Sequence, residues 1–180
     1  VKARREIEQN LKVVDIVIML LDARAPLACR NPELEQMIRQ KSLILVLNKA
    51  DLAEARSTSR SKAYLKRQGY WVAAMDSLHC RGSKEVLDLI KKAYSPVAAV
   101  MMQKGRRVRP VRVMVVGVPN VGKSSFINCL AGRKIARVGE KPGITRGRQW
   151  LRIREDIELM DTPGLMWPKI EDEKQGLKLA

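Results

Sequence analysis

One short segment constrains the fold of this chain more than any other. Residues 117–124, GVPNVGKS, have the pattern G-x-x-x-x-G-K-[ST]. The segment follows the apolar run 111–116 and leads into the periodic apolar stretch 124–130, so it lies between an expected strand and an expected helix. This order directs backbone N–H groups and a helix N-terminus at one point, where they can bind an anion. The pattern predicts a phosphate-binding loop, with a structural glycine turn as the alternative.

The side chains of this loop suit a bound nucleoside triphosphate. Lys123 would supply a cation to the β- and γ-phosphates, and the Ser124 hydroxyl would be a ligand of Mg²⁺. Glycine at positions 117 and 122 lets the backbone approach phosphate closely. The predicted phosphate-binding residues are Asn120, Val121, Gly122, Lys123, Ser124 and Ser125.

A second motif, at residues 48–51, follows the apolar run 42–47 and has the sequence NKAD. N-K-x-D is the guanine-reading motif of GTPases, in which the Asp51 carboxylate would accept hydrogen bonds from N1–H and the 2-amino group. Adenine offers no such pair of donors, and a mismatch that leaves buried polar groups unpaired gives strong discrimination. Residues 76 and 77, after the expected strand 70–74, fit the loop whose backbone contacts the guanine O6. The predicted base-binding residues are Asn48, Lys49, Ala50, Asp51, Asp76 and Ser77.

A third group of residues fits the segments that sense the γ-phosphate. Residues 161–164, DTPG, form a D-x-x-G motif at the end of an expected strand. Asp161 would hold Mg²⁺ through water, and the Gly164 N–H would contact the γ-phosphate. Thr145, in the segment KPGITR, would complete the Mg²⁺ shell when that phosphate is present. D-x-x-G alone is a weak signal, because an ordinary turn has the same sequence.

The rest of the chain alternates between expected strands and helices. Apolar runs at 13–21, 42–47, 70–74 and 111–116 read as strands, and 149–153 with 157–160 reads as a hairpin. Helical spacing marks an N-terminal helix and segments at 58–68 and 86–94, and Asn31-Pro32 reads as a helix start. We expect the helix after residue 86 to end at Ser95-Pro96 and residues 96–110 to be a linker. The pattern predicts an α/β fold with a mostly parallel sheet.

The charge of the chain indicates an anionic partner. The formal net charge is +16, and residues 101–154 hold fourteen basic residues against one acidic residue, Glu140. Self-repulsion of this size favours binding to a polyanion, which would be a nucleic acid first and an acidic membrane surface second. The aromatic content of 4% argues against base stacking as the main mode of binding.

The cysteines and the apolar runs exclude several other classes of protein. Cys29, Cys80 and Cys129 are an odd number without a C-x-x-C pair, so we expect neither a disulfide scaffold nor a structural zinc site, and we expect a reducing compartment. No apolar run approaches the roughly 18 residues of a membrane span, and no secretory signal is visible.

The motifs form a GTPase set in an unusual order. Asn48 precedes Gly117 by 69 residues, so the base-reading motifs come before the phosphate loop, whereas ordinary GTPases have the reverse order. A circular permutation explains this order. With the segments DARAP (22–26), RNP (30–32), KPGIT (141–145) and DTPGLMWPK (161–169), the chain resembles the circularly permuted GTPases of ribosome assembly, of the RbgA/YlqF type, over its whole length.

The resemblance implies an activity and a division of the chain. The expected function is Mg²⁺-dependent hydrolysis of GTP as a switch in assembly of the large ribosomal subunit, with that subunit and its RNA as partners. We expect a circularly permuted GTPase domain over 1–180, with a base-reading half (1–95), a basic linker (96–110) and a phosphate-loop and switch half (111–180). The C-terminal RNA-binding domain of relatives is expected to be absent from this chain. A monomer in the cytoplasm, or in the matrix of an organelle, is the expected form.

The resemblance also bears on catalysis. Leu165 stands where many GTPases have a water-orienting Gln, and the His that relatives supply upstream of the N-terminal helix is absent, so the catalytic residue is unknown and intrinsic hydrolysis should be slow. The one His, His79, is expected to be a bystander. Asn120 matches the residue that holds K⁺ in relatives, with a loop-stabilising hydrogen bond as the alternative. Two other functions stay open: an RNA-binding module with a structural nucleotide, and a P-loop ATP enzyme.

Overall fold

The computed structural model describes residues 2–134 and 149–161. The helices are α1 (Lys2–Leu11), α2 (Pro32–Ile38), the 3₁₀ turn η1 (Ala50–Leu52), α3 (Ala55–Arg67), α4 (Ser83–Gln103) and α5 (Lys123–Ala131). The strands are β1 (Ile16–Asp22), β2 (Ser42–Asn48), β3 (Trp71–Met75), β4 (Val111–Gly117), β5 (Gln149–Arg154) and β6 (Ile157–Asp161). In this part of the chain, every helix is too short or too polar to cross a bilayer.

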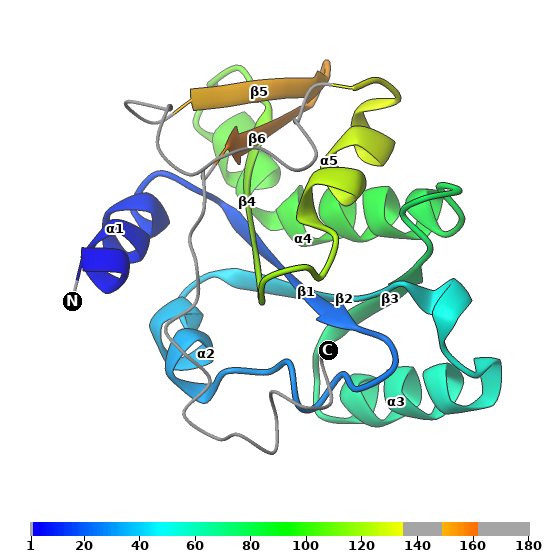
Figure 1. Cartoon of the computed structure of the whole chain (residues 1–180). Helices are drawn as coiled ribbons and strands as arrows, with labels where there is room; N and C mark the ends of the chain where they lie inside the picture. Colours follow the sequence, from blue (N-terminus) through cyan, green and yellow to red (C-terminus); the bar gives the residue numbers. More distant parts are fainter. Residues whose placement is uncertain (1, 135–148, 162–180) are drawn as a thin grey trace.

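The six strands form one sheet between two layers of helices. The strand order is β3-β2-β1-β4-β6-β5, and only the β5–β6 pair is antiparallel. Helices α4 and α5 cover one face, and α3 covers the other (Figure 1). All seven residues of β1 are buried, because this central strand has a neighbour on each side and a helical layer on each face. The predicted α/β fold with a mostly parallel sheet is confirmed.

The strand register brings the carboxyl ends of four strands to one edge of the sheet. Asp22 at the end of β1 lies opposite Asn48 at the end of β2, and Asn48 lies opposite Met75 at the end of β3. Gly117 at the end of β4 pairs with Leu20 of β1. Ligands of open parallel sheets bind at this carboxyl edge, so the register places the predicted motifs together despite their separation in sequence.

Several local predictions are confirmed by the backbone. Helix α2 begins at Pro32, and the Asn31 side chain accepts a hydrogen bond of 3.0 Å from the Leu34 N–H, as an N-cap does. Helix α3 ends before Gly69, whose φ of +89° is a conformation that favours glycine.

The predicted helix end at Ser95-Pro96 is wrong, because α4 continues through Pro96 to Gln103. Proline removes one helical hydrogen bond, but the residues beyond it make contacts that hold the helix. The Tyr94 hydroxyl contacts Met101 Sδ at 3.9 Å and donates to the Arg109 carbonyl at 3.0 Å. The first eight residues of the expected linker are therefore helical, and the non-helical connection is 104–110.

This connection is fastened to the sheet by an ion pair. The Arg109 guanidinium donates two hydrogen bonds of 2.8 Å to the Asp15 carboxylate, which also accepts the Arg112 N–H at 2.9 Å. Asp15 lies just before β1, and Arg112 lies in β4, so one carboxylate joins the start of two adjacent strands to the connection from α4.

Candidate nucleotide-binding site

The predicted phosphate loop lies between β4 and α5, as the sequence indicates. Gly122 has a φ of +96°, and a Cβ atom there would lie 2.6 Å from the Asn48 side-chain nitrogen. A Cβ at Gly117 would lie 2.9 Å from the Leu20 carbonyl oxygen. Both glycines are therefore required by close packing against the neighbouring strands. Asn120, at the turn between them, also has a positive φ of 60°.

Lys123 folds back over the loop. Its ammonium donates hydrogen bonds to the carbonyls of Gly117 at 2.9 Å and Val118 at 3.2 Å. Burial lowers the pKa of this amine, and none of the described carboxylates lies within ion-pair distance of it. A charged amine held only by two carbonyls is ready to exchange them for phosphate oxygens.

Asn48 is the residue that joins the separate parts of the site. Its side chain is buried, and its amide nitrogen donates to the Val121 carbonyl in the phosphate loop at 2.7 Å. Its amide oxygen accepts the Ser77 hydroxyl at 2.6 Å. One side chain at the end of β2 therefore contacts both the phosphate loop and the loop after β3.

Lys49 and Asp51 follow Asn48 in a tight turn. Lys49 has a left-handed φ of 56°, and its ammonium lies 3.4 Å from a carboxylate oxygen of Asp22. Asp51 is exposed in the 3₁₀ turn η1 at the mouth of a cavity. The turn leaves the Asp51 carboxylate accessible to a ligand.

Asp22 is a site residue that the motif analysis missed. It is buried, and it accepts hydrogen bonds from the Arg24 guanidinium at 2.9 and 2.8 Å. Burial alone would raise the pKa of Asp22, but the hydrogen bonds and charges of Arg24 and Lys49 outweigh it and lower the pKa. The carboxylate therefore stays ionised and holds Lys49 in place. The sequence signal for Asp22 is its place at the end of the apolar run 13–21, in the segment DARAP.

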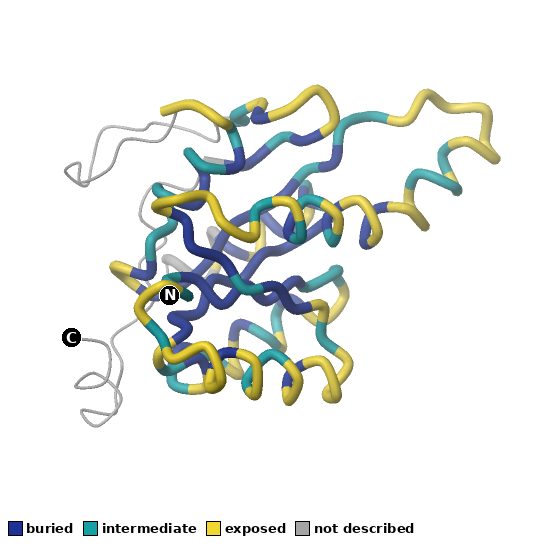
Figure 2. The backbone as a smooth tube through the Cα atoms, turned by 90° about the vertical axis from the view of Figure 1, so that its right-hand side faces the viewer, coloured by how far each residue is buried: buried dark blue, intermediate teal, exposed yellow. Residues whose placement is uncertain are grey.

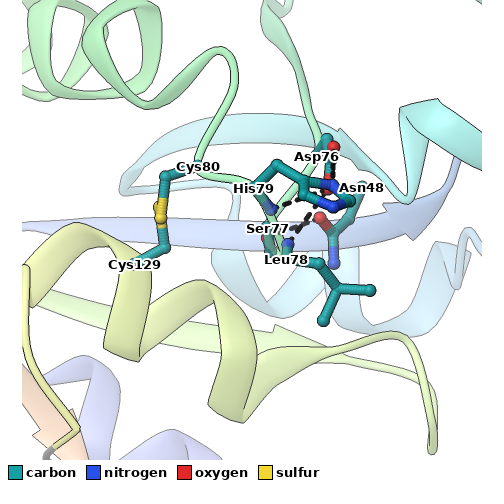
Figure 3. The surroundings of a disulfide bond; sticks show 7 residues. All are labelled: Asn48, Asp76, Ser77, Leu78, His79, Cys80 and Cys129. Atoms are coloured by element: carbon teal, nitrogen blue, oxygen red, sulfur yellow. Dashed lines mark hydrogen bonds and ion pairs between the residues drawn. A yellow bond between two sulfur atoms is a disulfide. The ribbon is translucent and has the colours of Figure 1, made fainter.

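The loop after β3 is closed by Asp76. Its carboxylate accepts the backbone N–H groups of Leu78 at 3.0 Å and His79 at 3.1 Å, and its other oxygen lies 2.7 Å from His79 Nδ1 (Figure 3). Burial would raise the pKa of Asp76, but the hydrogen bonds from His79 and Leu78 lower it. His79, expected to be a bystander, therefore helps to shape this loop.

A disulfide joins the same loop to the phosphate-loop helix. Cys80 is bonded to Cys129 of α5, with their Cα atoms 5.5 Å apart (Figure 3). Cys29 is free and buried. One such bond is not a disulfide scaffold, but the sequence analysis did not predict this pairing. Sequence could not show the pairing, because 49 residues separate the two cysteines and only the packing of the loop on α5 brings them together.

Five of the six predicted base-binding residues and three of the six predicted phosphate-binding residues line one cavity of about 250 Å³, whereas Ala50, Val121, Lys123 and Ser124 are not among its lining residues. Its lining includes Asn48, Asp51, Ser77, Asn120, Gly122 and Ser125. The volume suits a purine base, and the polar groups converge from three loops. Lys49 and Asp51 follow β2, and Asp76 and Ser77 follow β3, whereas Asn120 and Ser125 belong to the phosphate loop and α5.

Some predicted residues fall outside this description. Thr145, Gly164 and Leu165 lie outside the described residues, and only the backbone of Asp161, at the end of β6, is described. Strand β6 runs parallel to β4, so Asp161 ends at the same sheet edge as the phosphate loop. Ser124 lies in the first turn of α5. Across residues 2–134 and 149–161, no three His, Cys, Asp or Glu side chains gather to hold a metal.

Comparisons with known proteins point to one group. The family described as "50S ribosome-binding GTPase" matches residues 112–180. Ribosome biogenesis GTPase A of Bacillus cereus is 44% identical over 99% of this chain and 60% of its own length. Mitochondrial ribosome-associated GTPase 1 of Mus musculus is 36% identical over 99% of this chain and 57% of its own length.

A solved structure agrees with this result. GNP-bound YlqF from Thermotoga maritima matches with a TM-score of 0.69 and 29% identity, over 99% of this chain and 64% of that chain. The chain therefore spans about three fifths of the length of the relatives that it matches.

The position of Lys123 generates a test of the phosphate loop. We predict that Lys123→Met raises the free energy of unfolding of the ligand-free chain by about 1 kcal/mol, because a poorly paired buried charge is removed. The same change should remove the stabilisation that GTP with Mg²⁺ gives. Thermal unfolding with and without nucleotide measures both effects, and Lys134→Met, at an exposed lysine after α5, is the matched control. A ligand-free Lys123→Met protein that is less stable than the control would contradict this account.

Proposed function

We propose that this chain, which is similar to Ribosome biogenesis GTPase A and YlqF, is a circularly permuted GTPase of the RbgA/YlqF type that binds GTP and hydrolyses it to GDP and phosphate during assembly of the large ribosomal subunit. The observation that carries the proposal is the Asn48 side chain. It connects the N-K-x-D segment to the phosphate loop and to the loop after β3 by two short hydrogen bonds. Base recognition and phosphate recognition would then share one preorganised cavity.

Each part of the proposed site has a role that follows from its position. The accessible Asp51 carboxylate would accept two hydrogen bonds from guanine. The loop that Asp76 closes would hold Ser77, which lines the cavity, where its backbone can contact the guanine O6. Lys123 and the backbone of residues 120–125 would surround the phosphates, with the N-terminus of α5 directed at them.

The residues also suit the cations that such a reaction needs. Mg²⁺ prefers oxygen ligands and takes several of them from the nucleotide and water. The Ser124 hydroxyl in the first turn of α5 would supply one, with Thr145 and Asp161 as the other proposed partners. Bound Mg²⁺ would neutralise charge on the phosphates. The Asn120 side chain, exposed at the turn of the loop, would be a ligand of K⁺.

The proposed hydrolysis is slow without a partner. Leu165 has no group that can orient water, and His79 is engaged with Asp76 at the base end of the cavity. The catalytic group therefore stays unassigned. We propose that the large subunit and its RNA act as the partner of a monomeric enzyme, in the cytoplasm or in an organelle matrix, and that contact with the subunit accelerates turnover.

Guanine specificity has a direct test at Asp51. We predict that Asp51→Asn weakens GDP binding on the order of 100-fold or more and favours xanthosine diphosphate, because the amide can donate where the carboxylate only accepts. Isothermal titration with the two nucleotides measures the change. Asp88→Asn, at an exposed aspartate of α4, is the matched control. Unchanged GDP affinity in Asp51→Asn would remove the N-K-x-D assignment.

The activity itself is tested by hydrolysis of GTP with and without purified large ribosomal subunits. We predict that subunits raise the rate at least about tenfold, because the partner completes a site that lacks a water-orienting group. K⁺ should support a faster rate than Na⁺ at equal ionic strength if Asn120 holds the ion. A rate that subunits do not change would favour a binding module with a structural nucleotide, and preference for ATP would favour an ATP enzyme.

A further inference from the structure

The end of α4 and the loop after it project from the domain. Figure 2 shows this projection at the upper right, with its residues almost all exposed. The loop leads into the start of β4, so it lies at the opposite edge of the parallel sheet from the nucleotide cavity, which is at the strands' carboxyl ends. We call Lys104, Arg106 and Arg107, with the exposed apolar Val100, Met102 and Val108, the basic tip.

The three cations of the basic tip are concentrated without opposing charge. No acidic residue occurs between positions 89 and 139 of the sequence. Among the described residues, none forms an ion pair with Lys104, Arg106 or Arg107. Three positive charges within four residues repel one another unless an anion neutralises them.

The neighbouring basic side chains differ from the basic tip, because they form ion pairs or ring contacts with other residues of the chain. Arg109 is paired with Asp15, and Lys91 lies 3.8 Å from Asp156. Arg112 lies over the Trp150 ring at 4.9 Å and 3.6 Å from Glu158. The basic residues of this region therefore form two groups. Lys91, Arg109 and Arg112 interact with other parts of the fold, whereas the cations of the basic tip are exposed to solvent.

The basic tip borders a groove that mixes cationic and apolar groups. The groove has a volume of about 630 Å³ and lies between α4, the 107–111 segment and the β5–β6 hairpin. Tyr94, Arg107, Val108 and Arg152 are among its lining residues. A phosphodiester backbone presents anionic oxygens and apolar sugar faces, so this combination suits a nucleic-acid backbone. Glu155 and Asp156 at the hairpin turn limit the basic surface on that side.

We propose that the basic tip is the surface by which this chain contacts the backbone of ribosomal RNA. The proposal rests on the proposed function, which supplies the class of partner, and it adds the place of contact. The permuted order makes this possible, because the connection 104–110 joins the two halves of the domain at this edge. RNA bound here would leave the nucleotide cavity open at the other edge. Contacts of this kind read the shape of the RNA and not its sequence.

The test is a triple charge reversal, Lys104→Glu with Arg106→Glu and Arg107→Glu, in the whole chain. Binding to protein-free large-subunit RNA should fall at least about tenfold. The slope of log affinity against log salt should decrease by about 2, since each phosphate contact contributes roughly 0.7. The matched control reverses Arg56, Arg60 and Lys66, which are exposed on α3 and have no ion pair among the described residues. It should bind RNA like the unmodified chain, and both variants should keep their GDP affinity.

Four results would overturn the proposal. An equal loss in the α3 control would show that total charge, and not the tip, drives binding. Normal RNA binding with lost co-sedimentation of intact subunits would make the tip a protein-binding surface. If the tip variant still binds RNA, the assignment of the tip as the RNA contact is wrong and the proposed function stands. An unmodified chain that binds neither RNA nor subunits would contradict both the assignment and the proposed function.

Discussion

The candidate site depends on the side-chain amide of Asn48. Its nitrogen donates to the Val121 carbonyl and its oxygen accepts from Ser77, and it is buried where water cannot replace either partner. Gly122 makes room for it, because a Cβ there would lie 2.6 Å from the amide nitrogen. A glycine in the phosphate loop and an asparagine 74 residues earlier are therefore parts of one contact.

The parallel sheet explains how a chain with a permuted order of motifs can bring them together in one candidate site. In a parallel sheet, the carboxyl ends of neighbouring strands meet at one edge whatever the order in which the strands follow along the chain. Here β1 lies between β2 and β4. The N-K-x-D segment after β2 and the phosphate loop after β4 therefore lie on either side of the end of β1. Asp22 at the end of β1 fills the space between them and holds Lys49. The permutation changes only which ends are joined, and the Asp15–Arg109 pair fastens the new connection.

The sequence predicts local features well and long-range contacts poorly. The strands were visible because buried parallel strands are almost continuously apolar, and the phosphate loop was visible because its glycines and lysine have fixed spacing. The continuation of α4 through Pro96 was not, since it depends on contacts of Tyr94 with Met101 and Arg109. The Cys80–Cys129 bond and the role of Asp22 likewise arise from packing between distant segments. The nucleotide roles of Asp51, Ser124, Thr145 and Asp161 stay predictions.

The central claim is that Asn48 joins the two halves of one nucleotide site, and calorimetric GDP binding by Asn48→Ala tests it most directly. The account predicts that affinity falls at least about tenfold, because two buried hydrogen bonds that position the loops are lost. Circular dichroism should show that the α/β fold is kept, since the sheet core does not depend on this side chain. A folded Asn48→Ala protein that binds GDP as tightly as the unmodified chain would contradict the account.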